Sequence, residues 1–190
     1  MNITPEKTQI IEFLKPYLPK ANQWIDELFA QYSSIAKPLS GFHFPRLPEY
    51  FSGEILENTR IVLLDKMPQI PFADLGFMKT SHLEMVATAG AALRDTIFIE
   101  KKFENAEALF FHELVHILQW RVFGHDDFLL AYGMGLVSNK DSYTKIFFEA
   151  MAYKYQSIFQ SSDKPFDVEK ELMPELLRFK ARFKALKELV

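Results

Sequence analysis

The segment FFHELVHILQW, residues 110–120, places two histidines and a glutamate among large apolar residues. Burying such polar groups without partners is costly, so their presence in an apolar helix needs a physical reason. His112 and His116 are four residues apart, which puts them on the same face of an α-helix, about 40° apart. Both imidazoles can then reach one ion, and the carboxylate of Glu113, which flanks the pair, can meet a water held on that ion. The spacing predicts a metal site.

The pattern His-Glu-x-x-His on a helix supplies two neutral nitrogen ligands and a general base that is not itself a ligand, as zinc hydrolases require. We therefore predict Zn²⁺ as the cofactor, with His112 and His116 as ligands and Glu113 as the base. The chain has no Cys, so any metal must be held by His, Asp or Glu. The alternative is a pair of core histidines with ordinary hydrogen-bond partners and Glu113 at a solvated edge.

A catalytic zinc needs a third protein ligand and keeps a fourth position open for water. Glu149, in the segment KIFFEAMAYKYQ, is the preferred candidate, because Phe147 and Phe148 border it and a carboxylate is out of place on an apolar face. The alternative for Glu149 is a surface position on an amphipathic helix. Other candidate ligands follow the helix stop at Gly124: Asp126, Asp127 and, less favoured, His125.

The longer metzincin pattern, His-Glu-x-x-His-x-x-Gly-x-x-His, is excluded. Gln119 stands where that pattern requires Gly, and Val122 stands where it requires the third His.

Several helices and two strands are expected to position these residues. Thr4-Pro5 is typical of a helix start, and that helix should end near Lys15-Pro16, with a second helix after Pro19. The five prolines between Pro38 and Pro71 favour ordered loops and short helical turns. The remaining expected elements are strands at 60–64 and 96–100, a helix from about 104 to Gly124, and helices at about 127–137, about 141–160 and from about 167.

The C-terminal segment carries apolar residues at alternating spacings of four and three: Leu172, Leu176, Phe179, Phe183, Leu186 and Val190. This stripe predicts a helix–helix contact, either within the chain, which is favoured because the stripe is short, or with a second copy or a partner in a coiled coil. Pro174 fits a first helical turn better than a helix interior, so the regular helix is expected near 173.

Length predicts one domain over residues 1–190, and the expected helices and strands make it a mostly helical α+β domain. Its metal-binding core is expected at about 85–160, followed by the amphipathic helix at about 167–190. The 19 phenylalanines favour an aromatic core over an apolar substrate groove.

Charge and hydropathy exclude several classes of partner. Lys plus Arg (22) nearly balance Asp plus Glu (25), so no basic field would attract nucleic acid. The first residues lack the features of a secretion signal, and no apolar run reaches the length of a membrane span. The chain is therefore expected to be soluble, with a cytoplasmic location favoured.

The pattern of His-Glu-x-x-His with a downstream Glu resembles the gluzincins. More closely, residues 87–120 are similar to the short bacterial metallopeptidase domain that is often attached to toxins and contractile injection systems. The matching features are a small-residue stretch at 87–92, the strand Asp95-Thr96-Ile97-Phe98, and the helix with His112, His116 and Gln119. Glu149-Ala150 and Tyr153 loosely match that family's third-ligand segment. Thermolysin-like gluzincins have Asp at the position of Tyr153, where it orients a zinc histidine.

This resemblance implies a zincin-like fold with a small sheet, a peptide or protein substrate, and Glu149 as third ligand. It also implies that strand 96–100 is the sheet edge onto which an extended peptide adds. A hydroxyl donor for the oxyanion is expected from Tyr132, Tyr143 or Tyr153, each of which could instead be a packing aromatic. The competing hypotheses are a non-catalytic zinc-binding or regulatory protein and a helical interaction module.

Overall fold

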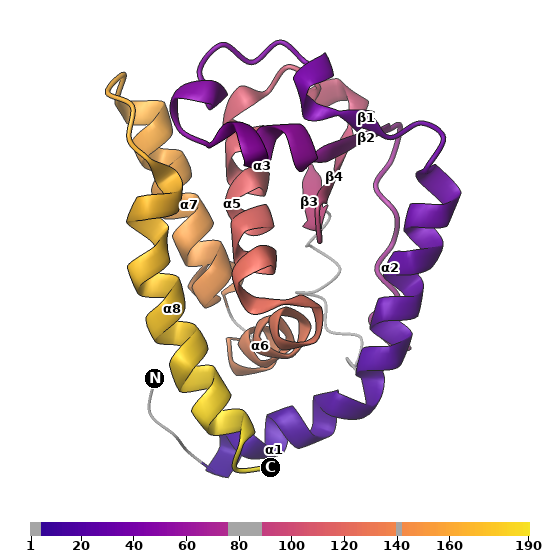
Figure 1. Ribbon diagram of the computed structural model, residues 1–190. Helices are drawn as coiled ribbons and strands as arrows, with labels where there is room; N and C mark the ends of the chain where they lie inside the picture. The colour runs from indigo at the N-terminus through magenta and orange to yellow at the C-terminus, as the bar shows by residue number, and fades with distance from the viewer. Residues whose placement is uncertain (1–4, 76–88, 140–141) are drawn as a thin grey trace.

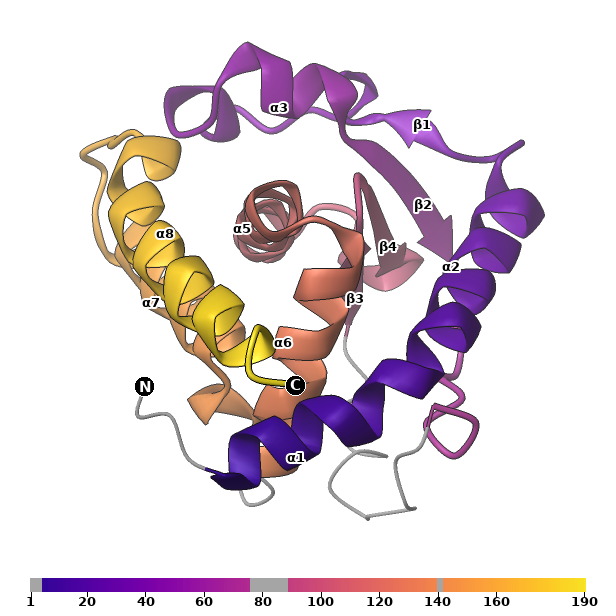
Figure 2. The same ribbon diagram turned by 60° about the horizontal axis from the view of Figure 1, so that its bottom comes forward.

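The computed structural model describes residues 5–75, 89–139 and 142–190. These residues form a mostly helical α+β structure with a four-stranded sheet, as the sequence predicted. Helix α5 (Glu107–Phe123) runs through the middle of the structure (Figure 1). Seen nearly end-on in Figure 2, α5 is surrounded by the sheet and the other helices.

Helix α5 is apolar on nearly every side, and twelve of its residues are buried. A helix that is apolar all round is stable only inside a core, which explains its central position. It ends at Gly124, whose φ of 77° is a conformation that other residues rarely adopt, and whose N–H donates to the carbonyl of Trp120. The predicted stop is therefore confirmed, and the next helix begins at once, at His125.

The sheet has the order β1-β2-β4-β3, with β2 and β4 parallel and the outer pairs antiparallel. Its strands are β1 (Lys37–Pro38), β2 (Arg60–Leu64), β3 (Gly90–Leu93) and β4 (Thr96–Glu100). The two predicted strands, at 60–64 and 96–100, are confirmed.

The prediction that strand 96–100 is the sheet edge is wrong, because β4 lies between β2 and β3. Ile97, Phe98 and Ile99 are almost fully buried, as expected of a strand covered on both faces. The edge strands are β1 and β3, and β3, next to β4, has the sequence Gly-Ala-Ala-Leu, which lacks the alternation that marks a strand. A two-residue turn joins β3 to β4, with Arg94 at a φ of 54°.

The N-terminal part forms a bent arm of α1 (Pro5–Leu14), η1 (Lys15–Tyr17) and α2 (Leu18–Tyr32). The break between two helices near Pro16 is thus confirmed, whereas the expected cap Thr4 lies outside the described residues. The proline-rich region contains the short helices η2 (Leu39–Gly41), η3 (Leu47–Glu49) and α3 (Gly53–Asn58), as predicted.

The C-terminal half contains η4 (Lys101–Phe103), α6 (His125–Ser138), η5 (Tyr143–Lys145), α7 (Phe147–Ser161) and α8 (Val168–Lys187). The helix expected from about 141 begins only at Phe147, because residues 143–145 form the separate turn η5; residue 141 lies outside the described part. The expected start of regular helix near 173 is also wrong. Helix α8 begins at Val168, where the side chain of Asp167 accepts from the Lys170 amide, and it continues through Pro174.

The apolar stripe of α8 is buried within this chain. Leu172, Leu176, Phe183 and Leu186 are buried, and α8 contacts α5 and α1. Intrachain packing therefore explains the stripe. Phe110, Phe111, Phe148 and Phe183 are fully buried, so the phenylalanines do build an aromatic core. Among the described helices, none is both long and apolar enough to cross a membrane.

Candidate metal centre

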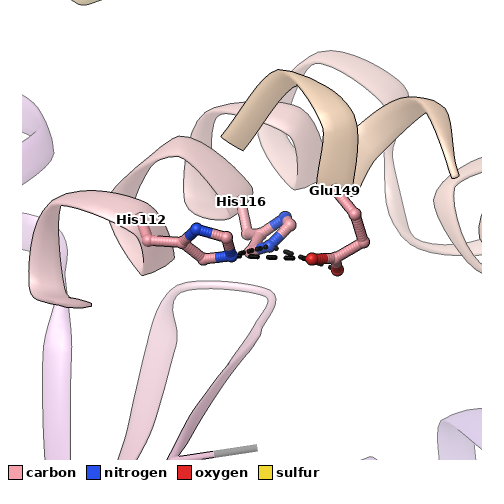
Figure 3. A group of neighbouring side chains, drawn as sticks. All are labelled: His112, His116 and Glu149. Carbon is pink, nitrogen blue, oxygen red and sulfur yellow. Dashed lines mark hydrogen bonds and ion pairs between the residues drawn. The ribbon is translucent and has the colours of Figure 1, made fainter. Parts of the chain in front are cut away.

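Three of the predicted site residues converge on one point between α5 and α7. Nε2 of His112 lies 3.5 Å from Oε2 of Glu149, and Nε2 of His116 lies 3.4 Å from Oε1 of the same carboxylate. Figure 3 shows the three side chains pointing toward one another. One ligand atom from each lies within 4.8 Å of the others, and all three residues are buried. This group could hold a metal ion.

Glutamine side chains orient both imidazoles. Nδ1 of His116 lies 2.7 Å from Oε1 of Gln119, whose own amide nitrogen donates to the carbonyl of Phe148 at 3.0 Å. Nδ1 of His112 lies 3.0 Å from Oε1 of Gln156. An amide oxygen only accepts, so each Nδ1 carries a hydrogen and each Nε2 of a neutral ring presents a lone pair to the cluster.

The centre of the cluster therefore has too many acceptors. The two Nε2 atoms are 3.1 Å apart, and both face the carboxylate of Glu149. Among the described residues, Oε2 of Glu149 is buried and has no hydrogen-bond partner. Lone pairs and a negative charge at such distances repel one another unless a proton or a metal cation lies between them. The donor set, two imidazoles and a carboxylate, fits zinc.

The electrostatics of the metal-free cluster show the same demand for positive charge. Burial alone would lower the pKa of His116, but the carboxylates of Glu149 and Glu113 raise it to about 9. Burial acts to raise the pKa of Glu149, yet the positive charge on His116 and the proximity of both imidazoles hold that pKa well below its usual range. A proton on His116 thus takes the place that a metal cation would fill.

Two of the three candidate tyrosines form a hydrogen-bonded chain with Glu149, the candidate third ligand. The hydroxyl of Tyr132 donates to Oε1 of Glu149 at 2.7 Å and lies 2.8 Å from the hydroxyl of Tyr143. Burial raises the pKa of both tyrosines, so both stay neutral hydroxyls. Tyr132 is thus bonded to the carboxylate and Tyr143 to Tyr132, and both side chains also line the cavity described below. The ring of Tyr153 packs edge-on against His112 at a centroid distance of 4.6 Å, and this side chain is 43% exposed.

Glu113 lies beside the cluster, where α5 meets the edge strand β3. It is buried, and burial raises the pKa of its carboxyl above the usual value, with the two imidazoles opposing that rise. A methyl group on Gly90 would come within 3.1 Å of Oε1 of Glu113, so the strand leaves room for this carboxylate only because residue 90 has no side chain. Trp120 fixes the strand to the helix by donating to the carbonyl of Ala92 at 2.9 Å.

The alternative third ligands are engaged elsewhere. Asp126 accepts a hydrogen bond from Asn22, and Asp127 pairs with Lys187. The ring of His125 packs near Trp120. The part of the chain that the structure describes brings only Glu149 to the two histidines.

A cavity of about 330 Å³ opens onto the cluster. Beyond the site residues, its walls are mainly apolar and come from β3, α6 and the N-terminal arm α1–η1–α2. Sequence reasoning did not predict a contribution from the arm, which lies far from the motif in the chain.

Sequence reasoning also gave no role to Gln119 and Gln156. Gln119 is fully buried three residues after His116, and Gln156 follows Glu149 by seven residues, two helical turns along the same face. A polar residue spaced by whole turns from an expected ligand is the signal that could have identified both.

No family model, curated protein or solved structure matches the chain. The resemblance to gluzincins and to short bacterial metallopeptidase domains therefore stays a prediction, and function must be inferred from the geometry of the site.

Proposed function

We propose that this chain is a zinc-dependent hydrolase with a zincin-like site, and that its substrates are peptides. His112, His116 and Glu149 would hold the ion, and Glu113 would act as general base. The proposal depends mainly on one observation: the Nε2 atoms of His112 and His116 converge on the buried carboxylate of Glu149. Among the described residues, one oxygen of that carboxylate has no hydrogen-bond partner. A second carboxylate, that of Glu113, lies beside this group without belonging to it.

A purely structural zinc site is four-coordinate and closed. Here the described residues supply three ligands, and the cluster borders a cavity large enough for a substrate group. When bound, zinc supplies a Lewis acid that polarises a carbonyl and lowers the pKa of water. The openness of the site favours catalysis over a structural role.

Glu113 has the properties that a general base needs. Burial raises the pKa of its carboxyl from the usual value toward neutral pH. The carboxylate can therefore take a proton from water and later give that proton to the leaving amine. Of the three candidate tyrosines that line the cavity, Tyr153 is half-exposed and is the preferred hydroxyl donor to the oxyanion.

The edge strand β3 offers a place for the substrate backbone. The carbonyl of Ala89 accepts a hydrogen bond from the amide of Glu100. Hydrogen-bonded and non-bonded pairs alternate along an antiparallel ladder, so Gly90 and its partner Ile99 form a non-bonded pair. The backbone N–H and C=O of Gly90 therefore point away from β4. Gly90 also lines the cavity, whereas the carbonyl of Ala92 is already bonded to Trp120. A peptide would therefore pair with β3 at Gly90 only over a short stretch.

The test compares the wild type with Glu113→Gln, using a broad peptide library read by mass spectrometry together with the zinc content of each protein. Loss of the base should reduce turnover by about 100-fold or more while zinc is retained. Glu104→Gln, an exposed carboxylate just before α5, is the matched control and should keep full turnover. A zinc-loaded wild type that cleaves no peptide would favour the non-catalytic zinc-binding alternative.

A further inference from the structure

We propose that the N-terminal arm α1–η1–α2 is the specificity wall of this site, and that it selects a peptide with a bulky, uncharged apolar side chain next to the bond that is cleaved. This inference rests on the proposed hydrolase function and adds the class of substrate. It also assigns a role to the N-terminal arm, which contains none of the motif residues.

The arm forms one wall of the cavity that opens onto the metal cluster. Leu14, Tyr17, Leu18, Ala21, Trp24 and Ile25 line it from the arm. Opposite them, Leu129 and Leu136 of α6 and Leu93 of β3 line the same space. Leu18, Trp24 and Leu129 are only partly buried although they are large and apolar, because they face this space.

Outside the metal cluster, the described residues that line the cavity offer no partner to a charged substrate group. Of the described residues that line it, none is Lys, Arg or Asp, and the only carboxylates are Glu113 and Glu149 of the site itself. A charged side chain entering it would lose its hydration without gaining a counter-ion, which strongly disfavours binding. An apolar side chain would instead bury its surface against the leucines and Trp24.

The size of the cavity favours a large side chain. A water molecule occupies about 30 Å³ in the liquid, so a cavity of about 330 Å³ holds roughly ten non-hydrogen atoms. By this count a tryptophan side chain would fill the space and a phenylalanine side chain would fill most of it, whereas an alanine would leave nearly all of it empty and lose the packing contacts.

Polar contacts fix the arm across the cavity. Arg94, in the turn between β3 and β4, pairs with Asp26 at 2.6 Å and donates to Asn22 at 3.1 Å. Asn22 in turn donates to Asp126 at the start of α6, at 2.8 Å. The arm is thus bonded to both the edge strand and α6, the two elements that carry the opposite walls. A wall held in this way can discriminate between side chains by shape.

The test measures binding to the zinc-loaded protein by calorimetry and needs no turnover. Acetohydroxamic acid, a small metal chelator, gives the reference affinity; 4-phenylbutyrohydroxamic acid adds an apolar tail, and glutaric acid monohydroxamate adds a charged one. Burial of the phenyl tail should raise affinity by about 30-fold over acetohydroxamic acid. The charged tail should give no gain.

Two variants of the arm test the wall directly. Leu18→Lys should abolish most of the gain from the phenyl tail and improve binding of the carboxylate tail, while acetohydroxamic acid binds as before. Ala21→Phe, which fills the cavity without adding charge, should also remove the gain from the phenyl tail. Leu177→Lys, an exposed leucine on α8, is the matched control and should change none of the affinities.

The outcomes separate the two proposals. If acetohydroxamic acid does not bind the zinc-loaded protein, the zinc has no open coordination position, and the proposed hydrolase function fails together with this inference. If acetohydroxamic acid binds but the phenyl tail adds no affinity, or the Leu18 and Ala21 variants bind it unchanged, the metal centre stands and the specificity wall is refuted. Cleavage of octanoyl amides in preference to peptides with Phe or Leu would refute the peptide side chain as occupant.

Discussion

Replacing Glu149 with Gln should weaken zinc binding by a factor that grows with pH. The substitution removes a charged ligand but nearly preserves shape. In the metal-free wild type, the same carboxylate holds a proton on His116, whose pKa is raised to about 9. Glu149 therefore favours both zinc and the proton that competes with zinc.

The magnitudes follow from these two roles. Four-ligand zinc sites bind with about 10–16 kcal/mol, so loss of one ligand removes about 3 kcal/mol, or about 100-fold in affinity. At pH 7 the wild type must first release a proton held with a pKa about two units higher, which weakens its binding by about 100-fold. In Glu149→Gln the pKa of His116 falls toward its ordinary 6.5, and this competition nearly disappears. The two affinities should thus lie within about tenfold at pH 7 and differ by about 100-fold at pH 9.

The assay is competition with a chelator of known zinc affinity at pH 7, 8 and 9. Asp126→Asn is the control. The sequence made Asp126 an alternative candidate ligand, but its carboxylate accepts a hydrogen bond from Asn22. The zinc affinity of this variant should equal that of the wild type at each pH. A ratio of affinities that stays constant with pH would refute the coupling of Glu149 to His116. Equal affinity of wild type and Glu149→Gln at pH 9 would refute Glu149 as a ligand.

Four further results are expected. Gln119→Leu, which leaves Nδ1 of His116 without its acceptor, should reduce zinc affinity about 10- to 100-fold in the same chelator assay. Saturating zinc at 100 times its dissociation constant should stabilise the fold by about 2.7 kcal/mol, visible in thermal unfolding as a rise of about 5–10 °C; no rise would contradict a site formed by the folded state. Without metal, the stability supplied by protonated His116 should be complete below pH 6.5 and lost as pH rises through about 9, whereas Glu149→Gln should lack this trend in urea unfolding. Phe183→Ala, in the fully buried contact of α8, should lower the free energy of unfolding by about 3–5 kcal/mol, and a change below 1 kcal/mol would contradict intrachain docking of α8.

The local part of the site could be predicted from sequence because it depends on one helix. The spacing of His112 and His116 fixes their common face once residues 107–123 are helical, and Gly124 marks where that helix stops. Glu149 was predictable for a different reason: its carboxylate stands beside two phenylalanines, one of them fully buried, and such a carboxylate needs a positive partner.

The rest of the site depends on contacts between distant segments. The position of β3 at the sheet edge could not be predicted from its sequence, Gly-Ala-Ala-Leu. These small residues show no alternation of apolar and polar side chains, and the order of strands depends on which strands pair in the folded chain. The role of the arm depends on helix packing across about a hundred residues of chain, as the bond between Asn22 and Asp126 illustrates. Tyr132 and Tyr143 were predicted as candidate hydroxyl donors, and only the tertiary structure shows that Tyr132 bonds to Glu149 and that Tyr143 bonds to Tyr132.

The most direct test of the central claim, that a divalent cation neutralises the acceptors of His112, His116 and Glu149, is elemental analysis of the protein purified without added metal. We expect about one zinc per chain in the wild type and almost none in a folded His112→Ala/His116→Ala variant. A wild type that contains no divalent metal and takes up none on dialysis against zinc, or a double variant that keeps its zinc, would refute metal binding by these three residues.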